Sequence, residues 1–210
     1  MNEQIITALD IGSSKLFAVS GLLTSGGLEI LGGEVAYPSQ EIVQSGRVVD
    51  MDSLTNELSE LFERMKQIVE EKVEWVVISV GGGHVRGQLY QKEMKIEPAG
   101  REITEADIKE LDQAIRADVI AADQTGRQIL HLLPQQYFVD YQSPTRKAPL
   151  GLHAHTLEVR VNAITAAVNP IQDIMQCLKR LDIEVELIFP GAWAAAEAVL
   201  NEEEKKLGAL

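Results

Sequence analysis

The chain is poor in cysteine and in basic side chains. Cys177 is the single cysteine among 210 residues, so no internal disulfide can form, and a reducing compartment such as the cytoplasm is expected. Only 19 lysines and arginines stand against 32 aspartates and glutamates, which gives a formal net charge of -13. Nucleic acid is therefore not expected as a partner, because neutralising its phosphates requires a basic face.

Long apolar runs are also absent. No stretch approaches the ~18 apolar residues that a membrane-spanning helix needs. The first residues, Met1-Asn2-Glu3-Gln4, lack the basic segment that begins a secretory signal. With 45% hydrophobic residues, the chain can bury a core as one or two domains. We therefore expect a cytoplasmic protein.

The first part of the sequence predicts a sheet. Apolar segments at residues 4–11, 15–22 and 28–37 are joined by short turns. Joins this short are typical of antiparallel strands that follow one another in a meander. A loop is expected after Pro38.

A helix and a buried strand are expected next. Apolar residues recur at spacings of three and four from Leu54 to Val69, which places them on one face of a helix. Asp52 or Ser53 is the expected N-cap. Residues 74–80 are almost entirely apolar, as in a strand that is covered on both faces.

A small α+β module is predicted between residues 84 and 160. Its strands are expected at residues 88–97, 128–141 and 156–165, and its helix begins with the capping pattern at Thr104. The apolar 128–141 segment is expected at an edge of the module's sheet, where it would favour pairing between copies of the chain.

Residues 161–210 return to an α/β pattern and complete, with residues 1–83, one discontinuous domain. Asn169 and Pro170 are expected to cap and to open a helix. The remaining expected elements are a strand at 184–189, an alanine-rich helix at 190–200, a short turn capped at Asn201 and the start of a strand at 207–210.

The main chemical motif is the sequence DIGSSK, which joins the first two predicted strands. The amides of Gly12, Ser13 and Ser14 are expected to donate to phosphate oxygens, and glycine removes the Cβ that would block their approach. Lys15 adds positive charge, and Asp10 is expected to hold a hydrated magnesium ion. An ordinary hairpin turn is the alternative interpretation. The position before any helix of an α/β domain favours phosphate binding.

A second glycine-rich stretch, residues 81–87, invites comparison with a dinucleotide-binding loop. Its spacing differs from G-x-G-x-x-G, and no helical pattern follows it. A dinucleotide loop must open a helix whose N-terminus holds the pyrophosphate. We therefore interpret these glycines as a sharp exit from the sheet.

Several stretches carry a family resemblance. The DIGSSK motif resembles the first phosphate loop of the actin, Hsp70 and sugar-kinase superfamily. Five further stretches resemble the FtsA family of bacterial cell division proteins: GRVVDMDSL at 46–54, SVGGGHV at 79–85, REITEADI at 101–108, ILHLLPQQYFVD at 129–140 and EEKKLG at 203–208. The 129–140 stretch is the most specific of them, since the wider superfamily has nothing like it.

The resemblance implies an α/β fold of the actin or ribonuclease-H type. Residues 1–83 and 161–210 would form the first actin-like domain, called 1A, and residues 84–160 the inserted SHS2-like domain, called 1C. Members of the family bind ATP with magnesium in a cleft between two halves and form short filaments. The implied cofactor-binding residues are Asp10, Gly12, Ser13, Ser14 and Lys15, with Asp10 reaching magnesium through water. No catalytic residue is implied, and the protein is expected to be a cytoskeletal scaffold, not an enzyme.

The resemblance also implies partners. Family members link the FtsZ ring to the cytoplasmic face of the inner membrane at the division site, through a C-terminal amphipathic helix. Domain 1C contributes to self-association and contacts later division proteins. In the family, a second phosphate loop of the D-x-G-G-G-T type follows the EEKKLG stretch. We therefore expect the chain to be an N-terminal part with half of the ATP cleft, and to bind nucleotide weakly or not at all by itself.

The sequence departs from the family pattern at two places. His153-Ala154-His155-Thr156 stands where a small residue followed by arginine is expected, and Asn162 replaces a histidine. The fine contacts of domain 1C are therefore not carried over. His153 and His155 would share one face of a strand, but no third metal ligand has motif spacing. Solvated histidines are the preferred interpretation, and no metal site is predicted.

Two other functions stay open on the sequence alone. One is a PilM-like assembly platform of type IV pili, which shares an inserted domain but should lack the 101–108 and 129–140 stretches. The other is a small-molecule kinase of the same superfamily, which would need a catalytic aspartate and a sugar pocket. The inserted module offers no convergent set of acids and bases for such a reaction.

Overall fold

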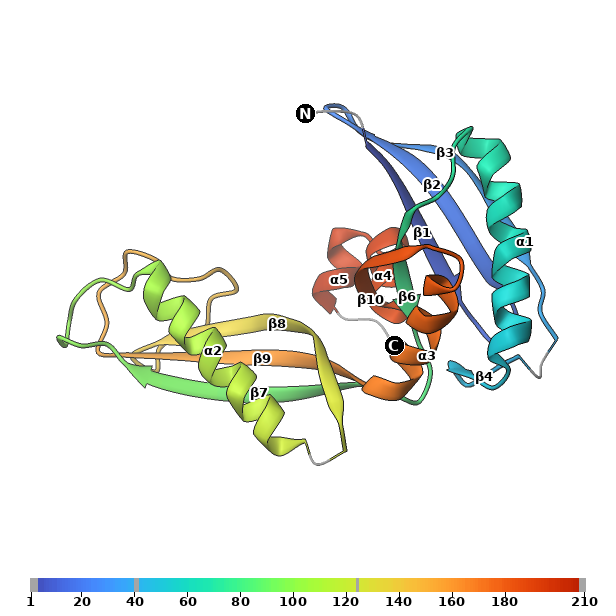
Figure 1. Ribbon diagram of the computed structural model, residues 1–210. Helices are drawn as coiled ribbons and strands as arrows, with labels where there is room; N and C mark the ends of the chain where they lie inside the picture. The colour runs from blue at the N-terminus through green and yellow to red at the C-terminus, as the bar shows by residue number, and fades with distance from the viewer. Residues whose placement is uncertain (1–3, 40–41, 124, 208–210) are drawn as a thin grey trace. The chain divides into compact units, whose positions relative to one another are not determined.

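The computed structural model describes residues 4–39, 42–123 and 125–207 and forms two compact units. Unit 1 comprises residues 1–85 and 168–210, and unit 2 comprises residues 86–167 (Figure 1). The sequence places the inserted module at 84–160. In the structure it continues to residue 167, because strand β9 (Thr156–Ala167) runs through residue 160 without a break.

Unit 1 contains a five-stranded sheet of order β10-β6-β1-β2-β3. The predicted antiparallel meander is confirmed, with β1 paired to β2 and β2 to β3. Strand β6 lies parallel to β1, and β10 lies parallel to β6. The strands are β1 (Gln4–Ile11), β2 (Leu16–Thr24), β3 (Gly27–Ala36), β6 (Trp75–Val80) and β10 (Glu184–Pro190).

Two buried hydroxyls pair across the middle of this sheet. Thr7 of β1 lies opposite Ser20 of β2, and their side-chain oxygens are 2.8 Å apart. Both residues are buried. A slip of one residue would place Thr7 opposite Val19 or Gly21, which offer no side-chain partner to a buried hydroxyl. Because an unpaired buried hydroxyl is costly, this pair favours the observed register.

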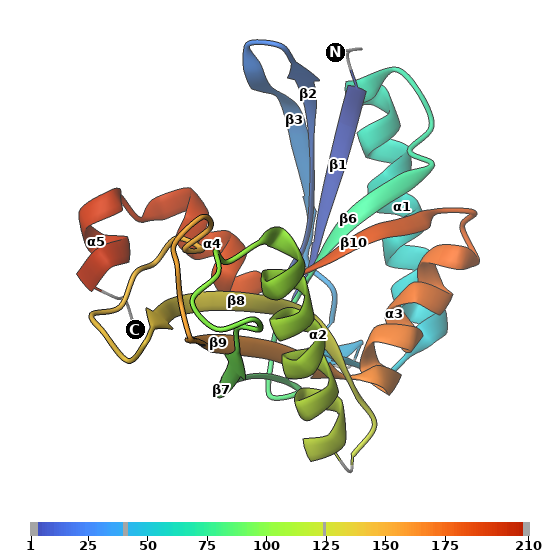
Figure 2. The ribbon, with the colours of Figure 1, turned by 90° about the vertical axis from the view of Figure 1, so that its left-hand side faces the viewer.

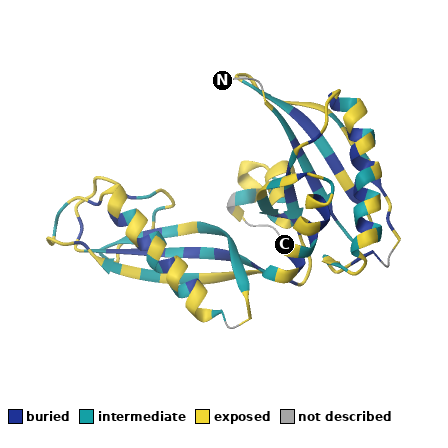
Figure 3. Ribbon diagram, viewed as in Figure 1, coloured by how far each residue is buried: buried dark blue, intermediate teal, exposed yellow. Residues whose placement is uncertain are grey.

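Helices α1 (Met51–Val69) and α3 (Val168–Lys179) cover one face of the sheet (Figure 2). The predicted apolar stripe of α1 is confirmed. Its buried residues are Leu54, Leu58, Leu61, Phe62, Met65 and Val69, and Figure 3 colours the buried and exposed positions along the helix. Helix α3 buries Ile171, Ile174, Cys177 and Leu178.

The predicted N-cap of α1 is wrong by two or three residues. Asp50, not Asp52 or Ser53, is the cap. Its Oδ1 accepts hydrogen bonds of 3.0 Å from the backbone amides of both of those residues, and its Oδ2 accepts one from the Ser53 hydroxyl. A carboxylate at this position satisfies amides that have no partner within the helix.

The second segment of unit 1, residues 168–210, also differs from the prediction at its start. Helix α3 begins at Val168, directly after β9, so Asn169 and Pro170 lie inside its first turn. The later helices are α4 (Gly191–Val199) and α5 (Glu202–Leu207), and Asn201 caps the second as expected. The strand expected to begin at 207–210 lies largely outside the described residues. No helix in the described ranges is long and apolar enough to cross a membrane.

A hairpin that the sequence analysis missed meets the exit of β6. Strands β4 (Val43–Gln44) and β5 (Arg47–Val48) pair through a turn at Ser45 and Gly46, both with positive φ, as a two-residue turn of type I′ requires. A Cβ on Gly46 would lie 2.0 Å from the carbonyl oxygen of Gly81. A Cβ on Gly82 would lie 2.2 Å from the carbonyl oxygen of Ser45. The two backbones therefore touch, with no space for a side chain.

Unit 2 is a three-stranded sheet of order β7-β9-β8 with one helix, α2 (Glu105–Ala122), packed on it (Figure 1). Strand β7 (Val85–Lys95) begins three residues before its predicted start, so the glycine loop ends at residue 84. Strand β8 spans Arg127–Val139. The hydrophobic core of the unit includes Ile96, Ile103, Leu111, Ile115, Leu157 and Val159.

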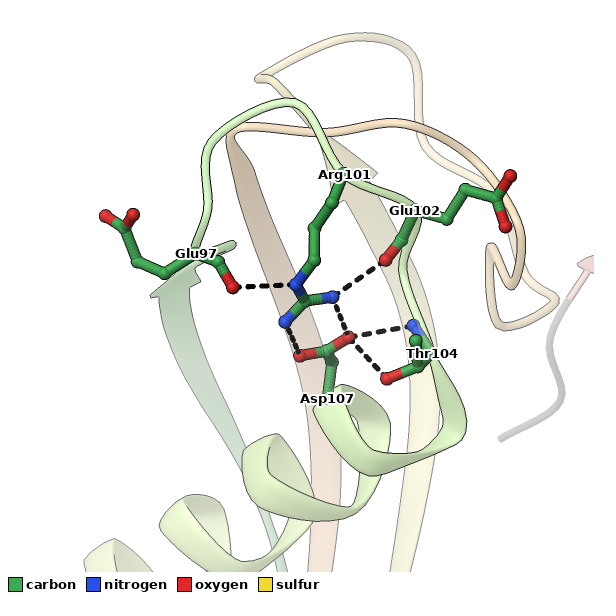
Figure 4. A network of polar contacts seen from close by, with 5 residues as sticks. All are labelled: Glu97, Arg101, Glu102, Thr104 and Asp107. Carbon is green, nitrogen blue, oxygen red and sulfur yellow. Dashed lines mark hydrogen bonds and ion pairs between the residues drawn. The ribbon is translucent and has the colours of Figure 1, made fainter.

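A polar network fixes the first turn of α2. Thr104 is its N-cap and forms a capping box with Asp107, as the sequence predicts. Arg101 donates two hydrogen bonds of 2.7 Å to the Asp107 carboxylate, and also donates to the backbone oxygens of Glu97 and Glu102 (Figure 4). The Asp107 side chain is 5% exposed. The hydrogen bonds from Arg101 hold the pKa of this buried carboxyl well below its usual value.

Strand β8 is an edge strand, as expected, but much of that edge is protected. Pro134 lies in the strand and has no amide to donate. The pairing with β9 shifts between Ile129 and His131 and again after Pro134. On the outer side, Tyr137 exchanges backbone hydrogen bonds of 2.8 and 2.9 Å with Thr145. The continuous pairing surface expected for copies of the chain is therefore interrupted.

We predict that Gly82→Ala lowers the free energy of unfolding by at least about 2 kcal/mol, because the added Cβ meets backbone that cannot move aside. The positive φ of Gly82 adds strain. Gly83→Ala is the matched control, since nothing lies within 4 Å of its added Cβ, and its stability should stay close to that of the unmodified chain. Urea unfolding followed by circular dichroism measures both. Equal effects of the two substitutions would contradict the backbone contact.

We predict that Asp107→Ala lowers the free energy of unfolding by about 2–4 kcal/mol, because it breaks the capping box with Thr104 and leaves the Arg101 guanidinium without its carboxylate. Asp112→Ala is the control. Asp112 pairs with Arg116 on the exposed side of the same helix, where such pairs contribute about 0.5 kcal/mol or less.

The stability that Asp107 contributes should depend on pH in the acid range. Its pKa is lowered in the folded state from an ordinary value of 3.8, so its contribution is fully present above that value and is lost as the pH falls further. Between about pH 4 and pH 2, the unmodified chain should therefore lose stability more steeply than Asp107→Asn. Parallel pH dependences of the two unfolding free energies would refute this role.

Candidate functional site

The DIGSSK motif forms a tight turn at the carboxyl end of β1. Gly12 donates its amide to the carbonyl oxygen of Lys15 at 3.0 Å, and the strands on either side pair up to Ile11 and Leu16. The sequence analysis expected the Gly12 amide to reach phosphate. In the structure the turn itself uses this donor, and phosphate binding by Gly12 stays a prediction.

The other donors of the motif remain available in the described structure. Ser13 and Ser14 stand at the centre of the turn, and no backbone acceptor in the described ranges takes their amides. Lys15 is exposed and forms no ion pair within those ranges. A Cβ on Gly12 would lie 3.0 Å from the carbonyl oxygen of Lys15, so a side chain here would require a small shift of the turn.

Asp10 has a partner that the sequence analysis missed. The Ser79 hydroxyl donates a hydrogen bond to Oδ1 of Asp10, and the two residues lie side by side in the parallel pair of β1 and β6. This bond orients the carboxylate. The predicted strand at residues 74–80 was the signal in the sequence that could have pointed to Ser79. Parallel strands end at the same edge of a sheet, and α/β proteins bind their ligands at that edge.

The N-terminus of α4 lies next to the same edge. A Cβ on Gly191, the first residue of the helix, would lie 3.4 Å from the Ser79 hydroxyl oxygen. No side-chain hydrogen bond caps this helix. Its first amides and its dipole favour a negative charge nearby. The described site thus combines a serine-rich turn, one oriented carboxylate and a helix N-terminus at the carboxyl ends of three parallel strands.

This arrangement fits part of a nucleotide complexed with magnesium. Amides, hydroxyls and an exposed ammonium group suit phosphate oxygens, and a carboxylate suits a hydrated magnesium ion. Two pockets of unit 1 lie elsewhere, one beside Ile5 and Trp75 and one beside Phe62 and Ile183.

The two histidines singled out from sequence do not form a metal centre in the described structure. His155 lies before β9, with its Nδ1 3.4 Å from Oδ2 of Asp140. Asp140 also accepts backbone hydrogen bonds from His155 and Thr156. No group of three or more histidine, cysteine, aspartate or glutamate side chains in the described ranges is placed to hold a metal ion.

Asn162, the other departure from the family pattern, lies in β9 opposite Leu133. A Cβ on Gly87 would lie 3.3 Å from the Asn162 side-chain oxygen. Asn162 is therefore packed against the backbone of β7. Unit 2 also carries a groove of about 580 Å³ between α2, β8 and the segment around Ala148 and Leu150, with a mainly apolar lining.

The sequence is similar to proteins of known families. Residues 82–165 match the family described as the SHS2 domain inserted in FtsA. The chain is 34% identical over 206 residues to the cell division protein FtsA of Pseudomonas aeruginosa, covering 98% of this chain and 48% of that protein. It is 29% identical to FtsA of Neisseria meningitidis, again over 98% of this chain and 48% of the relative. The chain thus spans about half the length of the curated relatives it matches.

The solved structures agree with the predicted fold. A chain of the PilM-PilN type IV pilus biogenesis complex superposes with a TM-score of 0.62 at 15% identity, covering 91% of this chain and 49% of that one. This likeness shows the fold alone. The predicted fold class, α/β with an inserted small α+β domain, is confirmed.

The sequence relatives separate the two scaffold interpretations. The family match at residues 82–165 spans both stretches, 101–108 and 129–140, that a PilM-like protein was expected to lack. FtsA of Bacillus subtilis, at 25% identity over 99% of this chain, extends the same similarity to a third organism. The chain is therefore a relative of the cell division protein FtsA along almost its whole length, and it carries the SHS2 domain that is inserted in that family.

Proposed function

We propose that the chain acts in bacterial cell division as the nucleotide-cleft and SHS2 part of a scaffold that links the FtsZ ring to the membrane. The observation that carries the proposal is the similarity to FtsA over 98% of this chain, together with a phosphate-type turn at the carboxyl edge of the unit 1 sheet. The whole protein would work at the cytoplasmic face of the inner membrane at the division site. FtsZ and the membrane would be held by other parts of such a protein.

Within this scaffold, unit 2 would serve protein–protein contacts. The family resemblance implies that the inserted domain contributes to self-association and binds later division proteins. The interrupted edge of β8 argues against a long strand-to-strand contact between copies, so contacts of the unit would use its faces more than that edge.

Unit 1 would hold the phosphates of ATP through the Ser13 and Ser14 amides and Lys15. Asp10, oriented by Ser79, would bind magnesium through water. A bound nucleotide would act as a structural ligand that sets the state of the scaffold. Hydrolysis would be weak, because the turn supplies a cradle and no general base beyond the single carboxylate.

We predict that a chimaeric FtsA supports division in Pseudomonas aeruginosa. In this chimaera, residues 1–210 replace the equivalent part of the native protein. Cells depleted of native FtsA should then divide at near-normal length, because the chain supplies the same two units. Cells with the Gly83→Ala chimaera should also divide at near-normal length, and cells with the Gly82→Ala chimaera should fail to divide and grow as long filamentous cells. A chimaera that accumulates normally, folds as judged by limited proteolysis and still leaves filamentous cells would contradict the proposed function.

We predict that the isolated chain binds ATP only weakly, at millimolar concentrations or beyond detection by calorimetry, because its groups contact one side of the phosphates and leave the base and ribose in water. The chimaera should bind more tightly. There, Asp10→Asn should reduce the affinity for magnesium–ATP by about tenfold or more, since a charged contact is lost. Asp52→Asn, at an exposed position on α1, is the control. Micromolar binding of ATP by the isolated chain would refute the prediction that the chain needs the rest of the protein to bind ATP tightly.

A further inference from the structure

A small polar pocket lies in unit 2 and is lined by residues of that unit alone. Its volume is about 250 Å³, which is below the ~300–1,000 Å³ of pockets for drug-sized ligands. Its lining comes from the start of β7, the last turn of α2, the turn that follows it, and the adjacent ends of β8 and β9. The lining residues are Arg86, Gln88, Tyr90, Val119, Ala122, Asp123, Thr125, Arg127 and Thr165.

Two guanidinium groups line this pocket. Arg127 is fixed by hydrogen bonds to Thr165, from Nε to the side-chain oxygen at 3.0 Å and from Nη2 to the backbone oxygen at 2.9 Å. Arg86 is exposed, and it forms no ion pair with any carboxylate of the described residues. Burial lowers the pKa of Arg127, and the like charge of Arg86 lowers it further. The two positive charges therefore repel each other across a partly buried space.

The one carboxylate of the lining serves the turn after α2. Oδ1 of Asp123 accepts hydrogen bonds from the amide and the hydroxyl of Thr125, and Oδ2 accepts one from the amide of Arg127. These bonds hold the turn. Asp123 offsets one of the two guanidinium charges, which leaves the lining with a net positive charge. This is a distinctive surface on a chain whose net charge is -13.

We propose that this pocket binds a phosphate group. Two guanidiniums that reach one space from different strands suit an anion that carries between one and two negative charges, as a phosphate does near neutral pH. The hydroxyl of Tyr90 and the amide of Gln88 are further donors in the lining. The volume of about 250 Å³ has room for a phosphate group. The site goes beyond the proposed division function and does not rest on it.

A purely structural role for the same arginines makes the opposite prediction. Helix α2 has no basic residue in its last turn, and a nearby positive charge can stabilise a helix C-terminus. If Arg86 served only this purpose, its removal would lower the melting temperature in chloride buffer. If it belongs to an anion site, its removal relieves repulsion, and the melting temperature in chloride stays equal or rises.

The test uses the 210-residue chain and inorganic phosphate, with sodium chloride at matched ionic strength as the reference. In ¹H–¹⁵N spectra, phosphate should cause saturable shifts at the amides of residues 86–90 and 125–127. At a phosphate concentration about tenfold above the dissociation constant, the melting temperature should rise by about 2–4 °C. Arg86→Gln should weaken phosphate binding by about tenfold or more, because a charge-assisted donor is removed.

Arg116→Gln is the matched control, since Arg116 also lies in unit 2 and pairs with Asp112 outside the pocket; it should bind phosphate like the unmodified chain. Sulfate should compete with phosphate, and acetate should compete poorly. Shifts that do not saturate, or that persist unchanged in Arg86→Gln, would overturn the proposal. So would an Arg86→Gln chain that melts at a lower temperature in chloride and binds phosphate with unchanged affinity.

Discussion

The contact between two glycine-containing backbones is the constraint on which unit 1 depends. Gly46 and Gly82 each occupy a position where a Cβ would overlap the other segment's backbone. This contact joins the β4–β5 hairpin to the exit of β6 and so fixes where that strand ends. The end of β6 carries Ser79, which orients Asp10. Two of the stretches that resemble FtsA, at 46–54 and 79–85, thus owe part of their pattern to one steric condition.

The starts of α1 in unit 1 and α2 in unit 2 are stabilised by different interactions. In unit 1, Asp50 alone satisfies the first amides of α1, and an apolar stripe then holds the helix on the sheet. In unit 2, the capping box of α2 is extended by Arg101, which ties the helix start to the backbone of the preceding segment. Losing one partner of the buried Asp107–Arg101 pair should cost more than losing an exposed charge, because the remaining charge would have no partner.

Sequence reasoning found the features that local patterns determine. The meander, the stripe of α1 and the capping box at Thr104 each follow from residues close together in the chain. The features it missed depend on contacts between distant segments. Ser79 acquires its role only when β6 pairs with β1, and Arg86 and Arg127 meet only when the sheet of unit 2 forms. The hydrogen bond from the Gly12 amide to Lys15 likewise appears only when the turn between β1 and β2 closes.

The buried hydroxyl pair of Thr7 and Ser20 bears on how the turn between their strands can change in length. The pair sets which residues of β1 and β2 face each other, and the turn from Gly12 to Lys15 closes the remaining distance. A one-residue insertion or deletion would have to be absorbed within the turn, because a shift of the strands would lose the pair. Among descendants of this chain, the turn should therefore accumulate substitutions more readily than changes of length, although turns usually tolerate both.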